Sequence, residues 1–240
     1  MAIYMWREYT VPADALYFEA NTANSTIILK KLNNPTAVNL ETSADGINWT
    51  DYTIWNTITL SNVWDKIYMR NKSDTQTWFS TNWNLYRFEM TWSISANWDI
   101  WYLLCKNSTN DLTDSWDWCL YSLFNDCTSL TTPPKLPATT LTFACYYYMF
   151  YNCPNLEALP ELPTLSLPSN CYYRMFMWCS KIKLSTTQTW QYQIPYRIPV
   201  TWTWTDPTWY GLSDMFYSTW WTFTSTPSIN TTYYTSNQVI

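Results

Sequence analysis

A block of nine residues recurs three times in this chain at a constant spacing. The blocks are CLYSLFNDC from Cys119, CYYYMFYNC from Cys145 and CYYRMFMWC from Cys171, so each begins 26 residues after the one before. A fixed period of about 20 to 29 residues is typical of repeat proteins, in which each unit packs on its neighbours. The repeat therefore limits the second part of the chain to a stack of similar units.

The apolar positions within each block are spaced as on one face of a helix. They are the first Cys, the Leu or Met four residues later, the aromatic residue after that, and the last Cys. This pattern predicts a helix in each block. Leu130, Leu156 and Ile182 follow at a fixed offset and predict short extended segments. Residues 215–217 are predicted to be a fourth, degraded copy, and residues 223–240 a polar cap.

These blocks, with the segment LPATTL at 136–141, resemble the BspA-like leucine-rich repeats of bacterial surface and phage-associated proteins. The resemblance covers about residues 100–240, although the unit here is slightly longer than the family's commoner one. It implies an α/β solenoid that serves adhesion or recognition at a cell surface. It brings no catalytic residues.

The first part of the chain is predicted to consist of strands. Alternating or β-branched segments occur at 16–20, 26–30, 38–41, 57–60 and 66–70, and no helical pattern lies between them. We therefore expect an α+β multi-domain fold. Residues 1–87 would form an Ig-like antiparallel β-sandwich, and residues 88–240 a short BspA-like solenoid with a C-terminal cap.

The numbers of glycine and tryptophan are anomalous. The chain of 240 residues has 2 Gly and 18 Trp, whereas an average composition of about 7% predicts roughly 17 Gly. We hypothesise that most Trp codons are UGA, read as glycine in the source and as tryptophan in this translation. An authentic Trp-rich carbohydrate-binding protein is the alternative.

The positions of the tryptophans favour recoding. Several occupy turn contexts in which glycine would supply a positive φ. They are Trp64, Trp83, Trp98, Trp202, Trp204, Trp220 and Trp221. Trp178 aligns with Asp126 and Asn152, residue types that tolerate left-handed backbone, and BspA-like repeats commonly have glycine there. Trp49, beside Gly46, is interpreted as genuine, whereas Trp118 and Trp209 are left open.

The charge and the absence of histidine exclude several functions. Because the chain has no His, His-dependent triads and His-ligated zinc are ruled out, and a net charge of −5 argues against nucleic acid. No apolar run is long enough to span a membrane. The N-terminus has no signal-peptide core, which favours a virion protein or a fragment of a longer secreted chain.

No metal site or disulfide is expected from the seven cysteines. Cys119 and Cys127 would lie about 12 Å apart on a helix, too far for a disulfide, and no C-x-x-C motif occurs. A ladder of buried thiols is predicted instead. The spacing of Asp111, Asp114 and Asp117 does not match a calcium-binding loop.

The sequence therefore predicts a non-catalytic surface module for adhesion or recognition, with no catalytic, cofactor-binding or metal-binding residue. Its partner would be a protein or glycan on another cell surface, and Tyr147, Tyr148 and Tyr173 are the candidate ligand-binding residues. The location would be extracellular, at a cell surface or on a virion. A phage tail-associated protein that recognises a host is the alternative. A glycan-active enzyme is a third hypothesis, although no carboxylate pair stands out.

Overall fold

A computed structural model describes residues 15–33, 35, 37–74, 79–80, 84–105, 117–164, 166–198, 201–202, 211–219 and 225–240. The first half contains β1 (Leu16–Ala20), β2 (Ser25–Leu32), β3 (Leu40–Ser43), β4 (Thr50–Tyr52), β5 (Ile58–Leu60), β6 (Lys66–Asn71), β7 (Leu85–Met90), β8 (Ile94–Asn97), the 3₁₀ helix η1 (Ile100–Leu103) and β9 (Leu130–Thr132). The second half contains β10 (Ala158–Leu159), β11 (Ser166–Leu167), β12 (Leu184–Ser185), β13 (Ile194–Arg197), β14 (Thr201–Trp202), β15 (Thr232–Thr235) and β16 (Gln238–Val239).

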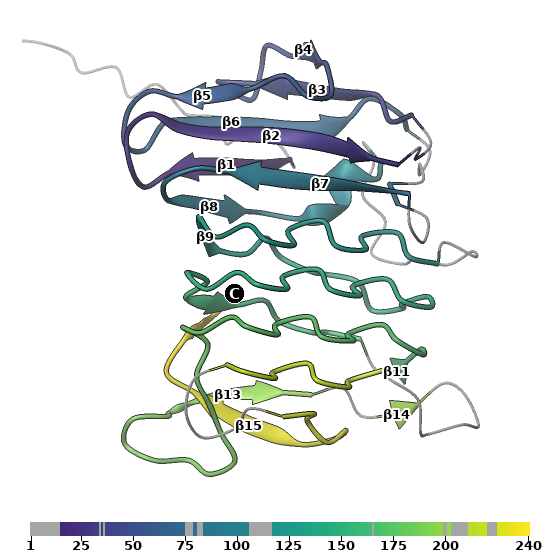
Figure 1. Cartoon of the computed structure of the whole chain (residues 1–240), viewed down its shortest axis with the longest axis vertical. Coiled ribbons are helices and arrows are strands. Elements are labelled where there is room, and N and C mark those ends of the chain that lie inside the picture. Colours follow the sequence, from purple (N-terminus) through teal and green to yellow (C-terminus); the bar gives the residue numbers. More distant parts are fainter. Residues whose placement is uncertain are drawn as a thin grey trace, which may run out of the picture.

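Two sheets in the first half pack against each other (Figure 1). One has the order β4-β3-β6-β1-β8-β9 and the other β5-β2-β7, and every pairing is antiparallel except that of β8 with β9. Alternate residues of β1 are fully buried, as in a strand with one face on a core. Phe18 of β1 meets Phe88 of β7 edge to face, at 4.9 Å between ring centroids. Strand β7 runs across the predicted domain boundary between residues 87 and 88.

The predicted α+β fold with a solenoid is wrong. The described residues contain no α-helix, their strands form several separate open sheets, and no solenoid of alternating strands and helices is present. The three repeated blocks are successive turns stacked beneath the N-terminal sheets (Figure 1). In an α-helix each N–H would donate to the carbonyl four residues earlier. Here the N–H of Leu123 donates to Leu120, three residues earlier.

Every second backbone N–H group of a block donates a hydrogen bond to a carbonyl of the next block. The N–H of Leu120 donates to the carbonyl of Cys145 at 3.1 Å, and the N–H of Phe124 donates to that of Met149 at 2.9 Å. The N–H of Phe150 donates in the same way to Met175 of the third block. Each block thus bonds its neighbour along its whole length, as a strand would.

A four-residue turn period explains why the helical interpretation failed. A positive φ recurs at every fourth residue, starting from the residue just before each block. The residues concerned are Trp118, Ser122 and Asp126, then Ala144, Tyr148 and Asn152, then Asn170, Arg174 and Trp178. Apolar residues at i, i+4 and i+8 fit this period as well as they fit the 3.6-residue period of a helix.

A ladder of phenylalanine rings runs through the core of the stack. Phe88, Phe124, Phe150, Phe176 and Phe216 stack in that order, with centroid distances of 5.2, 5.5, 5.6 and 5.5 Å. Because Phe88 belongs to β7, the ladder joins the N-terminal sheets to the repeats in one hydrophobic core. The ring of Phe216 confirms that residues 215–217 continue the repeat after an insertion.

No described helix has the length and apolarity needed to cross a membrane.

The ladder predicts a large loss of stability when one of its rings is removed. Phe150 is completely buried between two other rings. Phe150→Ala should therefore lower the free energy of unfolding by about 3–5 kcal/mol, measured by urea denaturation. Phe143→Ala, at a half-buried position outside the ladder, is the control and should cost clearly less. Equal costs at the two positions would show that the ladder has no special role.

Candidate functional site

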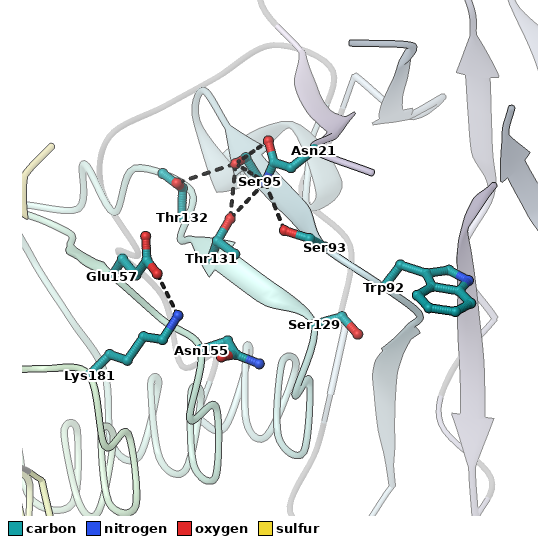
Figure 2. Close-up of a pocket in the computed structure, with 10 residues that line it drawn as sticks. All are labelled: Asn21, Trp92, Ser93, Ser95, Ser129, Thr131, Thr132, Asn155, Glu157 and Lys181. Carbon is teal, nitrogen blue, oxygen red and sulfur yellow. Dashed lines mark hydrogen bonds and ion pairs between the residues drawn. The ribbon is translucent and has the colours of Figure 1, made fainter. Parts of the chain in front are cut away.

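A polar cleft of about 500 Å³ lies where the N-terminal sheets meet the repeats. Figure 2 shows the residues that line it. They come from loops next to β1 and β7, from β8 and β9, and from two later repeats: Asn21, Trp92, Ser93, Ser95, Ser129, Thr131, Thr132, Asn155, Glu157 and Lys181. Nine of these ten side chains are polar, so the cleft is suited to a ligand with many hydrogen-bonding groups.

Asn21 organises the wall formed by the N-terminal sheets. Its Nδ2 atom lies 3.0 Å from Ser95 Oγ and 2.9 Å from Thr131 Oγ1. Ser95 Oγ also lies 3.1 Å from Thr131 Oγ1 and 3.3 Å from Thr132 Oγ1. This network fixes the side chains of three chain segments before any ligand binds (Figure 2).

The repeat positions the opposite wall. Ser129, Asn155 and Lys181 are equivalent positions of three successive units, and Thr131 and Glu157 are equivalent positions of two. The backbone N–H of Glu157 donates to the carbonyl of Thr131 at 2.7 Å, which holds the two units in register. Ser129 Oγ donates to the carbonyl of Met90 at 3.1 Å, and Asn155 Nδ2 donates to that of Thr128 at 2.8 Å, so these two side chains are held against the wall that they line.

Glu157 and Lys181, which both line the cleft, form an ion pair (Figure 2). Their side chains are 59% and 46% exposed, so the pair contributes little to stability, about 0–1 kcal/mol. Both groups can exchange this contact for a ligand at small cost. The cleft thus offers one carboxylate and one ammonium group beside a bank of hydroxyls and amides.

The three tyrosines predicted to bind a ligand form a second cluster, away from the cleft lining. Tyr147 stacks on Tyr173 at 4.7 Å and meets Tyr148 edge to face at 4.6 Å. Arg174 lies over the Tyr173 ring at 4.8 Å and donates to the Tyr148 hydroxyl at 3.0 Å. Because 147 and 173 are equivalent positions, as are 148 and 174, the repeat brings these side chains together.

The environment of this cluster raises the pKa of the Tyr147 hydroxyl above its ordinary value. Burial raises the pKa of its hydroxyl, and the neighbouring Tyr148 and Tyr173 hydroxyls raise it further. All three tyrosines are only partly exposed, and their rings are largely engaged with one another. The cluster is therefore a preformed, half-buried aromatic surface beside Arg174, whose guanidinium is paired with Asp214.

The cysteines are buried free thiols. All seven are buried, and the Sγ atoms of Cys119 and Cys145 lie 3.1 Å apart. The thiols of Cys127, Cys153 and Cys179 each donate at 3.0 Å to the carbonyl of a phenylalanine in the ladder. These repeated contacts give the last cysteine of each block a packing role.

No metal centre is formed by the described residues: they contain no group of three or more His, Cys, Asp or Glu side chains suited to a metal ion. Asp117 accepts a hydrogen bond from the N–H of Phe143 at 3.1 Å. Asp111 and Asp114 lie outside the described residues.

Comparison of the chain with protein-family models, curated proteins and solved structures found no significant match. The resemblance to BspA-like repeats therefore stays a prediction.

The sequence pattern alone does not predict the cleft. Its upper wall depends on Asn21, Ser95 and Thr131, which are up to 110 positions apart and are joined only by the sheet pairings. Its lower wall could have been found, because Ser129, Asn155 and Lys181 share the 26-residue period. Polar residues at one repeat position are a signal for a shared surface.

Burial predicts that the thiols are unreactive in the folded protein. It raises the pKa values of Cys127, Cys145, Cys153 and Cys171, and only the thiolate attacks a disulfide reagent. With 5,5′-dithiobis(2-nitrobenzoic acid) at mildly alkaline pH, the native protein should react very slowly. All seven cysteines should react after unfolding in urea. Rapid labelling of a repeat cysteine in the native state would show that the stack opens readily.

Proposed function

We propose that this chain is a non-catalytic recognition module that binds a surface glycan in the polar cleft. The observation that carries this function is the lining itself, in which hydroxyl, amide, carboxylate and ammonium groups surround a cavity of about 500 Å³. Sugars present neighbouring hydroxyls that both donate and accept hydrogen bonds. The Ser, Thr and Asn side chains have the same dual capacity.

The rigidity of the walls supports binding. Asn21, Ser95 and Thr131 are already held by hydrogen bonds, so little side-chain freedom is lost when a ligand arrives. The lower wall belongs to hydrogen-bonded repeats rather than to a long loop. A preorganised polar surface of this kind favours recognition of a defined sugar geometry.

The cleft supports binding more than hydrolysis. Glycosidases generally use two carboxyl groups that flank the scissile bond. Glu157 is the single carboxylate among the described residues that line the cleft, and its partner is Lys181. A surface adhesin and a virion protein that recognises a host would both use such a site. Structural phage genes beside this gene would favour the virion.

The tyrosine cluster favours a second candidate function, the binding of a protein. Tyr and Arg are the residue types that dominate binding energy at protein interfaces. Tyr148, Tyr173 and Arg174 meet on one surface, and Arg174 is also anchored by Asp214, with 3.1 Å between Nε and Oδ2. This surface would engage a partner independently of the cleft.

Binding in the cleft should depend on the exposed ion pair. Lys181→Ala and Glu157→Gln should each weaken binding to the best ligand of an immobilised oligosaccharide panel by about tenfold, or about 1.4 kcal/mol. The melting temperature should change little, because the pair is exposed. Affinity would be measured by isothermal titration calorimetry.

Lys72→Ala is the matched control. Lys72 forms a comparably exposed ion pair with Asp51, at 2.6 Å, and neither residue lines the cleft. This variant should bind like the unmodified chain. If no oligosaccharide binds, or if Lys181→Ala and Lys72→Ala bind equally well, the cleft is not the glycan site. Loss of a protein partner on Tyr148→Ala alone would support the tyrosine cluster instead.

A further inference from the structure

Positive φ angles are concentrated at the tryptophans of this chain. The backbone is described at ten of them: Trp49, Trp55, Trp64, Trp92, Trp98, Trp101, Trp118, Trp178, Trp190 and Trp202. Six have a positive φ: Trp55 (77°), Trp64 (72°), Trp92 (64°), Trp98 (72°), Trp118 (65°) and Trp178 (64°). Trp202, where the sequence favours glycine, lies in β14 and has no positive φ. Four further positions where the sequence favours glycine lie outside the described residues: Trp83, Trp204, Trp220 and Trp221. Only a few per cent of non-glycine residues adopt such angles, and bulky residues do so least readily. Glycine adopts them without steric cost.

Five of these six tryptophans also expose their side chains. Trp55, Trp64, Trp92, Trp98 and Trp178 are 41–69% exposed and are among the most exposed large apolar residues of the described chain. Trp118 differs, because its ring packs against Tyr121, Phe143 and Tyr147. At the five exposed positions, an unfavourable backbone conformation coincides with a large side chain that is 41% exposed or more. Three of these rings each make one contact at the surface: Trp55 with Lys30, Trp98 with Lys135 and Trp178 with Tyr151.

At three of these positions, backbone groups form hydrogen bonds with distant parts of the chain. The N–H of Trp64 donates to the carbonyl of Ala20 at 2.8 Å, and the N–H of Trp55 donates to that of Leu29 at 3.0 Å. The carbonyl of Trp98 accepts from the N–H of Lys135 at 2.8 Å. These bonds fix the turn geometry at each site. They need no side chain, and a glycine would form them equally well.

Two other tryptophans show the opposite pattern. The Trp49 ring lies 3.7 Å from the guanidinium carbon of Arg70, and Trp101 is 2% exposed in the core. Neither has a positive φ. At these two positions a closely packed indole occurs without a positive φ, as expected for genuine tryptophan.

The repeat adds independent support at Trp178. Asp126, Asn152 and Trp178 are equivalent positions, and all three have a positive φ, of 61°, 55° and 64°. Asp and Asn are the non-glycine residues that tolerate this conformation best. Of the three residues at this repeat position, only the tryptophan is poorly suited to a left-handed backbone.

We propose that the natural protein carries glycine at positions 55, 64, 92, 98 and 178, because UGA codons in its gene are decoded as glycine. The conformation and exposure of each position carry this assignment, which does not rest on the proposed glycan site. It affects that site at one point: Trp92 lines the cleft (Figure 2), and glycine there would remove the one aromatic side chain from the described lining. A tryptophan platform would then play no part in ligand binding.

Codon identity tests the assignment directly. The source DNA should contain TGA at the five positions and TGG at positions 49 and 101. Mass spectrometry of tryptic peptides from the natural protein should show glycine at the five positions. TGG at positions 64, 92 and 98 would overturn the proposal, as would peptides that contain tryptophan there.

Stability measurements on the chain with tryptophan at these positions provide a second test. Trp64→Gly and Trp92→Gly should raise the melting temperature, because each replacement relieves an unfavourable backbone conformation. Trp190→Gly is the control for exposure alone: Trp190 is 83% exposed but has no positive φ, so its replacement should give no increase. Trp49→Gly should lower the melting temperature through loss of the Arg70 contact. A decrease for Trp64→Gly and Trp92→Gly as large as that for Trp49→Gly would contradict the assignment.

Discussion

The architecture depends on the division of backbone hydrogen bonds within each repeated block. Alternate N–H groups donate to carbonyls three residues earlier and to carbonyls of the next block. The first set shapes each turn, and the second set stacks the turns at a constant separation. That separation brings equivalent side chains within contact of one another, so both the phenylalanine ladder and the tyrosine cluster follow from it.

The sequence predicted the repeat and the inward-facing residues but not the backbone conformation. The period of 26 residues and the burial of Cys119, Leu123 and Phe124 all follow from the printed residues. The helix did not follow, because apolar residues four apart satisfy a helical face and a four-residue turn equally well. The hydrogen bonds that distinguish the two are made with another block, beyond any local pattern.

The two candidate sites also differ in how far the sequence predicts them, because one depends on the repeat period and the other on contacts between distant strands. Tyr147 and Tyr173 are equivalent repeat positions, so the period alone places them side by side. The upper wall of the cleft requires the pairing of β1 with β8 and of β8 with β9, which joins Asn21 to Ser95 and Thr131. Sheet pairing between distant strands leaves little trace in one sequence. A polar cleft at such a junction is therefore seen only in three dimensions.

The longer connection between Phe176 and Phe216 bears on how the length of such repeat proteins can vary. Phe176 stacks on Phe216 as closely as Phe150 stacks on Phe176, although 40 residues rather than 26 separate the last pair. The connection between blocks can therefore change in length while the stack remains intact. Natural or engineered sequences could lengthen this connection and so diversify one edge of the molecule without changing the core.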